Sequence, residues 1–100
     1  MATVNVNFST KKQTVPATTD VSNRVNVLLM QGATVRAIKD VFLPATSVSF
    51  DGVSDGTYTI KAQRASSVGG PVGDPSESEP FDVVNTVDID VPDVVTVTFG

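Results

Sequence analysis

SVSFDGVSDGTYTIKAQRA, residues 47–65, is the stretch that decides the fold of this chain. Before its two Asp-Gly pairs, Val48 and Phe50 alternate with serines, and after them Tyr58 and Ile60 alternate with polar residues. A period of two gives a strand one apolar face and one wet face. The stretch therefore predicts two antiparallel strands joined by a tight turn and lying over a single core.

The same alternation, together with many β-branched residues, predicts further strands along the chain. They cover Thr3–Phe8, Arg24–Met30, Ala33–Leu43, Phe81–Val91 and Val95–Phe99, with a turn at Pro92-Asp93. No segment shows the 3.6-residue period of a helix over more than a turn or two. We therefore predict an all-β fold, an immunoglobulin-like antiparallel β-sandwich of about seven to eight strands. Residues 1–100 are expected to form one domain.

Two of these strands leave alternatives open. In Ala33–Leu43, either Val35 with Ala37 or Arg36 with Ile38 forms a face of the strand. Phe81–Val91 is either one long strand or two strands joined near Asn85-Thr86, with the aspartates at 82, 88 and 90 on its wet face in both cases.

Polar stretches separate the strands. Ser9–Asn23 is rich in threonine and predicts either a long connection or an arm that orders only against something else. Ser66–Pro80 is rich in Gly, Pro and Ser and predicts a long loop. Leu28 and Met30 make the outer face of their strand apolar, so either the N-terminal connection or a partner protein is expected to cover them.

The composition removes several kinds of functional site. The 100 residues include no cysteine and no histidine, which excludes disulfides and thiolate ligands and takes away the commonest general base. No serine has the glycine neighbours of a nucleophile elbow. We therefore predict a protein that is not an enzyme and has no cofactor. No apolar run reaches the roughly 18 residues of a membrane span, and the N-terminus lacks an export signal, so no membrane contact is expected.

Charge is divided unevenly along the sequence. The net charge is -4, but residues 1–65 carry seven basic and four acidic residues, whereas residues 66–100 carry seven acidic and no basic residues. Either a solvated acidic edge or contact between oppositely charged surfaces of neighbouring copies accounts for this division. The scattered basic residues disfavour nucleic acid as a partner.

The acidic residues also raise the question of a metal site. Asp88, Asp90 and Asp93 lie close together in the sequence, as do Asp74, Glu77 and Glu79 in the loop. In the first group, Asp88 and Asp90 alternate with aliphatic residues, which is typical of charge on an exposed strand, and the second group matches no calcium-loop spacing. We therefore predict no metal.

The segment from Val53 to Ala62, followed by the glycine-rich loop and PSESEP at residues 75–80, resembles the end of a fibronectin type III domain. The resemblance covers about a third of the chain, and it implies that Tyr58 is a tyrosine-corner residue whose hydroxyl binds backbone. Gly56 then belongs to the turn before Tyr58. The Val53-to-Tyr58 spacing is one residue shorter than usual in that family, and no tryptophan is present. The same turn also resembles the Gly-Thr-Tyr turn of carboxypeptidase-regulatory-like modules. Residues 94–100 lie outside the pattern as an added strand.

These features favour a structural or assembly protein that binds a larger protein assembly or itself in many copies. A small cysteine-free domain of this type resembles the decoration and accessory proteins of tailed bacteriophages, which implies a virion location, with the cytoplasm as the alternative. The candidate contacts are Leu28, Met30, Asp74, Glu77, Val95, Val97 and Phe99, together with the arm 9–23. The alternative function is a ligand-binding or adhesive module of a surface or secreted protein that uses the 66–80 loop.

Overall fold

A computed structural model of the chain describes residues 1–13, 20–43, 47–73 and 75–99, and for residues 10–13, 92–93 and 95–99 it describes the backbone. The described part contains eight strands: β1 (Ala2–Gln13), β2 (Arg24–Gln31), β3 (Thr34–Phe42), β4 (Ser47–Val53), β5 (Gly56–Arg64), β6 (Ser76–Glu77), β7 (Phe81–Val83) and β8 (Ile89–Phe99). Among these described residues, none forms a helix long and apolar enough to span a lipid bilayer.

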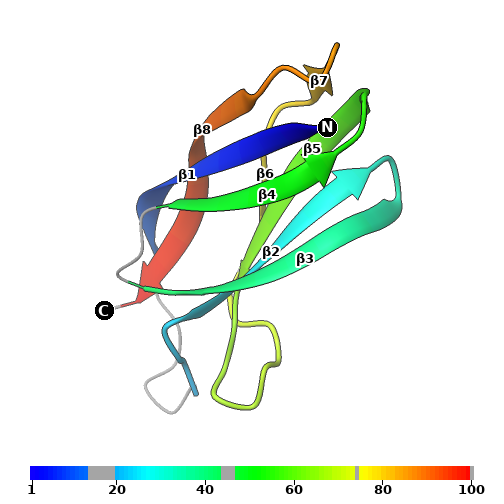
Figure 1. Cartoon of the computed structure of the whole chain (residues 1–100). Coiled ribbons are helices and arrows are strands. Elements are labelled where there is room, and N and C mark those ends of the chain that lie inside the picture. The colour runs from blue at the N-terminus through cyan, green and yellow to red at the C-terminus, as the bar shows by residue number, and fades with distance from the viewer. Residues whose placement is uncertain (14–19, 44–46, 74, 100) are drawn as a thin grey trace.

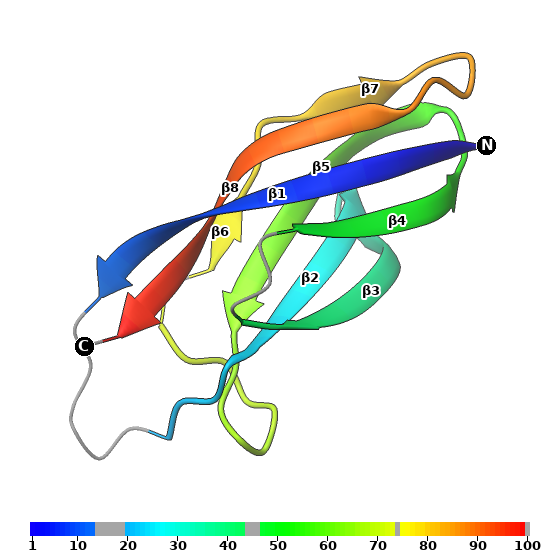
Figure 2. The ribbon, with the colours of Figure 1, turned by 60° about the vertical axis from the view of Figure 1, so that its left-hand side comes forward.

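The strands form two sheets that face each other (Figures 1 and 2). The smaller sheet has the order β4-β1-β8. The larger sheet has the order β3-β2-β5-β6, and β7 also pairs with β5, at the opposite end of that strand from β6. The predicted all-β architecture, compatible with a β-sandwich, is therefore confirmed.

The core lies between the two sheets and consists largely of valines. Every second residue points into it in the first half of β1, from Ala2 to Val6, and in β2 from Val25 to Leu29, as the period-two patterns predict. Val4, Val6, Val25 and Val27 have no exposed surface. Phe50 of β4 is the largest of the side chains that are at most 2% exposed. Each buried aliphatic side chain contributes about 1.5–3 kcal/mol to folding, so this layer of side chains holds the two sheets together.

The two strands of the 47–65 stretch exist as predicted, but their arrangement as a hairpin is wrong. β4 pairs with β1 in the smaller sheet, whereas β5 pairs with β2 in the larger one. The short link between them therefore crosses from one layer to the other. Phe50 and Ile60 still face the same core, but from opposite sides, and both are at most 2% exposed.

Tyr58 lies just after this crossing. Its hydroxyl donates a hydrogen bond to the backbone oxygen of Ser54 over 2.7 Å, a bond of the kind that the family resemblance implies. Gly56 lies between them, and a Cβ atom there would stand 2.7 Å from the side-chain nitrogen of Gln31 and 3.4 Å from the ring of Tyr58. The lack of a side chain at Gly56 thus lets β5 start close beside the end of β2.

Substitution of Tyr58 by phenylalanine is expected to lower the free energy of unfolding by about 1 kcal/mol, because it removes the part-buried 2.7 Å bond to the Ser54 backbone oxygen and a weaker 3.4 Å bond with the Ser54 hydroxyl. Urea denaturation measures this change. Ser54→Ala is the control, since it keeps the backbone oxygen that accepts the 2.7 Å bond and removes only the longer 3.4 Å bond between the two hydroxyls. A loss in Ser54→Ala as large as that in Tyr58→Phe would contradict this assignment of the bond.

The C-terminal strand differs from the prediction in direction and length. β8 runs parallel to β1, from the pair Val4 and Ile89 to the pair Gln13 and Phe99. The expected turn at Pro92-Asp93 is wrong: the chain continues through these residues, and one extra residue in β8 shifts the register there. A bulge of this kind accommodates proline, which has no N–H to donate to a neighbouring strand.

This pairing also corrects the N-terminal prediction. β1 continues to Gln13, so the first five residues of the expected 9–23 arm form a strand alongside β8. Residues 14–19 of that arm lie outside the described residues. Pairing with a strand distant in sequence thus decides the structure of a segment that has few apolar residues of its own.

The 66–80 segment is not a loop throughout. β6 lies within it and pairs with β5, and Ser78 continues this pairing because its N–H donates to the Ile60 oxygen over 2.8 Å. The Ser78 hydroxyl then accepts the Ile60 N–H over 2.8 Å, which leaves the following Glu79-Pro80 free to bulge away before β7 begins. A side chain here takes the place of a backbone acceptor, so the Ile60 N–H of β5 stays paired although the chain departs at Glu79-Pro80.

Between β7 and β8, the chain turns at Asn85-Thr86, as one of the two open alternatives predicts. The N–H of Val87 donates to the Val84 oxygen over 3.2 Å, and Asn85 and Thr86 have φ angles of 55° and 57°. The aspartates at 82, 88 and 90 are exposed, as their position in the alternating pattern predicts.

Candidate functional site

The outer face of the larger sheet carries a group of apolar side chains on β2 and β3. Leu28 lies directly opposite Ile38, and Met30 lies directly opposite Val35. Opposite residues of paired strands share a face, so all four project away from the core. Ile38 is 63% and Val35 is 44% exposed, while Leu28 and Met30 are half-buried. We call these four residues the outer patch.

A β-bulge creates this patch and settles the register of the 33–43 strand. Leu29 pairs with Ala37, but the next residue, Met30, pairs with Val35, so Arg36 is an extra residue in β3. The bulge turns both Val35 and Ile38 outward. The sequence offers Val35 with Ala37, or Arg36 with Ile38, as one face of the strand, so neither alternative contains this pair. The Arg36 side chain is fixed by a 2.7 Å hydrogen bond from its Nε to the Oε1 of Gln31.

Polar residues surround the outer patch on the same face. Lys61 of β5 pairs with Leu28, and Thr59 pairs with Met30. Asn26 and Asp40 lie opposite each other beyond Leu28, and the carboxylate of Asp40 forms an ion pair with Arg24. An exposed apolar group with a polar rim is the usual composition of a protein-binding surface.

Leu28 and Met30 are thus the predicted contact residues that the structure brings together. Val35 and Ile38 were missed as contacts, although Ile38 is an isoleucine in a strand with charged neighbours, a signal of an exposed apolar residue. The backbone of Val95, Val97 and Phe99 pairs with β1 at Ser9, Lys11 and Gln13, far from Leu28 along the sequence and in the other sheet. Their side chains, and all of Asp74, lie outside the described residues.

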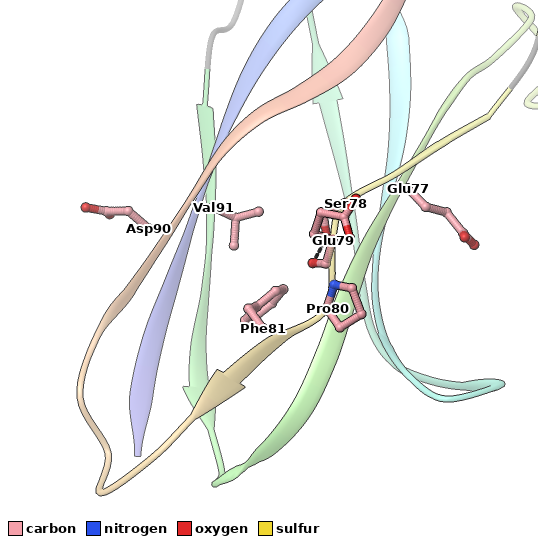
Figure 3. A pocket seen from close by; sticks show the side chains of 7 residues that line it. All are labelled: Glu77, Ser78, Glu79, Pro80, Phe81, Asp90 and Val91. Carbon is pink, nitrogen blue, oxygen red and sulfur yellow. Dashed lines mark hydrogen bonds between the residues drawn. The ribbon is translucent and has the colours of Figure 1, made fainter.

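Glu77 belongs to a different feature, a cleft of about 440 Å³ along one side of the fold where β8 faces β6 and β7. In Figure 3, Phe81 and Val91 point toward each other across this cleft, whereas Glu77 and Asp90 point away on either side. The cleft therefore has an apolar part at Phe81 and Val91 and a polar part at Ser78 and Glu79, with the carboxylates of Glu77 and Asp90 at its borders. The Ser78 hydroxyl, which lines the cleft, accepts the N–H of Ile60 over 2.8 Å.

The first part of the 66–80 segment, which the alternative binding-module function would use, is tied to itself and to β5 by hydrogen bonds. Ser66 and Gly70 exchange hydrogen bonds: the N–H of Ser66 donates to the Gly70 oxygen over 2.8 Å, and the N–H of Gly70 donates to the Ser66 hydroxyl over 3.1 Å. The amide of Gln63 donates to the oxygens of Val72 and Gly73, both over 3.0 Å. Val68 remains at the tip of the loop with 89% of its surface exposed.

Arg64 joins the base of this loop to the segment before β2. Its Nε donates to the oxygen of Ser22 over 2.8 Å, and the residue is only 8% exposed. Burial lowers the pKa of the Arg64 guanidinium from its usual value through loss of hydration. Its role is to connect two backbone segments, so it is a structural cation here.

Several acidic residues accept hydrogen bonds from N–H and hydroxyl groups, and within the described segments no three acidic residues gather around a point where a cation would bind. The carboxylate of Asp55 accepts hydrogen bonds from the N–H groups of Asn85 and Thr86, both over 3.1 Å. Asp88 accepts from the N–H of Thr3 over 2.9 Å. These carboxylates therefore stabilise turns and strand ends.

Comparison of the chain with protein-family models, with curated proteins and with solved structures finds no match.

Proposed function

We propose that this chain is a non-enzymatic structural domain that binds another protein through the outer patch. The observation that carries the proposal is the adjacency of Leu28, Met30, Val35 and Ile38 on one outer sheet face. Water contact with such a group is unfavourable by roughly 25 cal/mol for each Å² of apolar surface. A partner that covers these side chains removes that cost, and the polar rim favours one orientation of the partner.

The finer fold that we propose is immunoglobulin-like. In that fold one sheet contains strands in the order C′-C-F-G, and the other contains strand B between strands A and E. The order β3-β2-β5-β6 agrees with the first sheet, and β1 beside β4 agrees with strands B and E. The bond from Tyr58 to Ser54 agrees with a tyrosine corner. β8 would then occupy the place of strand A, but in the parallel direction.

The partner that we propose is a protein of a larger assembly, present in many copies, with a capsid or tail protein of a bacteriophage virion as the expected case. Neither nucleic acid nor a membrane is part of the proposal. The support is the combination of a small domain, an exposed apolar sheet face and a chain without histidine or cysteine.

Replacement of Ile38 by aspartate tests the outer patch. Because Ile38 is 63% exposed, Ile38→Asp is expected to change folding stability little but to weaken partner binding at least about tenfold, since a charge would be buried in the interface. The assay follows tagged wild-type and variant chains, in extracts of cells that make the protein, through a density gradient together with large particles. Sedimentation of the purified chain detects self-association in parallel.

Val68→Asp is the matched control, because it places the same charge on an 89% exposed valine of the loop. It is expected to bind as the wild type does. Loss of binding in Val68→Asp with retention in Ile38→Asp would instead support the alternative function, a binding module that uses the 66–80 loop. Equal binding by all three chains would contradict both assignments.

A further inference from the structure

The turn between β7 and β8 is strained. Positive φ angles at both central residues, 55° at Asn85 and 57° at Thr86, with the bond from the Val87 N–H to the Val84 oxygen, define a type I′ turn. That turn favours Asn followed by Gly. Threonine is branched at Cβ, and a positive φ is costly for such a residue. The closed turn thus has a poorly suited residue at its second position.

The sequence on either side of this turn has the pattern of a continuous strand. Phe81, Val83, Val87 and Ile89 share one parity, with Asn85 between them as a single polar residue. In the closed turn this pattern is broken, and Val84 and Val87 are 56% and 59% exposed. If residues 84–88 became extended, the positive φ angles would be lost, and Val87 would lie on the same face as Val83 and Ile89.

The contacts that hold β8 in place, with β1 and β5, could equally be made with the β1 and β5 of a second copy of the chain. Within the described strands β8 pairs with β1 alone, along one edge of the smaller sheet. Its inward residues Val91 and Val94 are 5% and 2% exposed and complete the core over β5. A β8 strand from a second copy would make these same contacts, so exchange preserves them while the turn opens.

We propose that two copies of this chain exchange their β8 strands, with residues 84–88 opening from the strained turn into an extended link. Short strained connections are known to promote such exchange. The two bonds from Asn85 and Thr86 to the Asp55 carboxylate favour the closed form and therefore oppose the opening. This mode of association uses the strand edge of the smaller sheet, so it is independent of the outer patch on the larger one.

Cysteine pairs distinguish exchange from simple contact, because the natural chain has no cysteine. Asn5 and Asp90 lie directly opposite each other across β1 and β8, and Asp90 is exposed. In the double variant Asn5→Cys/Asp90→Cys, a short bis-maleimide would join the two thiols within one chain in the closed form. It would join two chains in the exchanged form. Denaturing gels separate these products after refolding at high protein concentration.

Two hinge variants in this background give opposite expectations. Thr86→Gly relieves the strain and is expected to lower the interchain product roughly tenfold relative to the parent. Asn85→Pro cannot adopt a φ near 55° and loses the N–H that binds Asp55, so it is expected to give predominantly interchain product and a dimer mass by light scattering.

Purely intrachain product from the parent would overturn the proposal, as would equal yields from the parent and Thr86→Gly. A dimer whose cross-links are all intrachain would also overturn it, since the copies would then associate without exchange. Ile38→Asp in the same background is expected to leave the interchain yield unchanged. Failure of the outer-patch proposal and failure of strand exchange are thus seen in different measurements.

Discussion

Phe50→Ala is expected to lower the free energy of unfolding by about 3–5 kcal/mol, a large part of the stability of a domain of this size. Phe50 is 2% exposed and lies on β4 against the buried valines of β1 and the residues of β5. The ammonium of Lys39, 5.8 Å from the ring centroid, lies above its face. Truncation removes the ring and leaves a cavity between two sheets that can collapse only in part.

Phe42→Ala is the matched control, because this phenylalanine is 64% exposed at the end of β3. Its effect is expected to stay within about 0.5 kcal/mol. Urea denaturation followed by far-ultraviolet dichroism measures both variants. Similar losses of stability in the two variants would show that Phe50 does not occupy the core.

Ser78→Ala is expected to lower the free energy of unfolding by about 1–3 kcal/mol, more than a surface serine normally contributes. The Ser78 hydroxyl accepts the N–H of Ile60 over 2.8 Å, and Ile60 has no exposed surface. Alanine would leave a buried N–H without an acceptor, because Glu79-Pro80 bulges away from β5 at this point. The cost is that of an unpaired buried donor.

The control for this variant is Ser76→Ala, two residues earlier in β6, where the backbone pairs with Ala62. It is expected to leave stability nearly unchanged. Ser78→Thr retains a hydroxyl and is expected to recover most of the loss in chemical denaturation. If Ser78→Ala and Ser76→Ala were equally stable, the N–H of Ile60 would have to find another acceptor.

The positions of most strands could be predicted from the sequence, because a side chain buried on one sheet face leaves a period of two. Val25, Val27 and Leu29 show that period and are all buried. The alternation of apolar and polar residues does not show which strand pairs with which. The link between β4 and β5 is as short as a hairpin turn, yet it crosses between sheets, because β4 pairs with β1 and β5 pairs with β2.

The sequence predicted two of the four residues of the outer patch. Leu28 and Met30 stand out because apolar residues occupy both faces of β2. Val35 and Ile38 differ by three positions, so they share a face in a strand only when a bulge inserts one residue between them. The sequence around Arg36 contains no glycine that would mark the bulge, and cross-strand pairing with β2 decides it.

Parallel pairing between the first and the last strand has a consequence for synthesis on the ribosome. Residues that lie at opposite ends of the chain, such as Val4 and Ile89, must meet before the smaller sheet is complete. Contacts this distant in sequence slow folding, and the nascent chain meanwhile exposes the edge of β1. Chaperones that recognise extended apolar segments would therefore find the valines of β1 accessible until β8 has been synthesised.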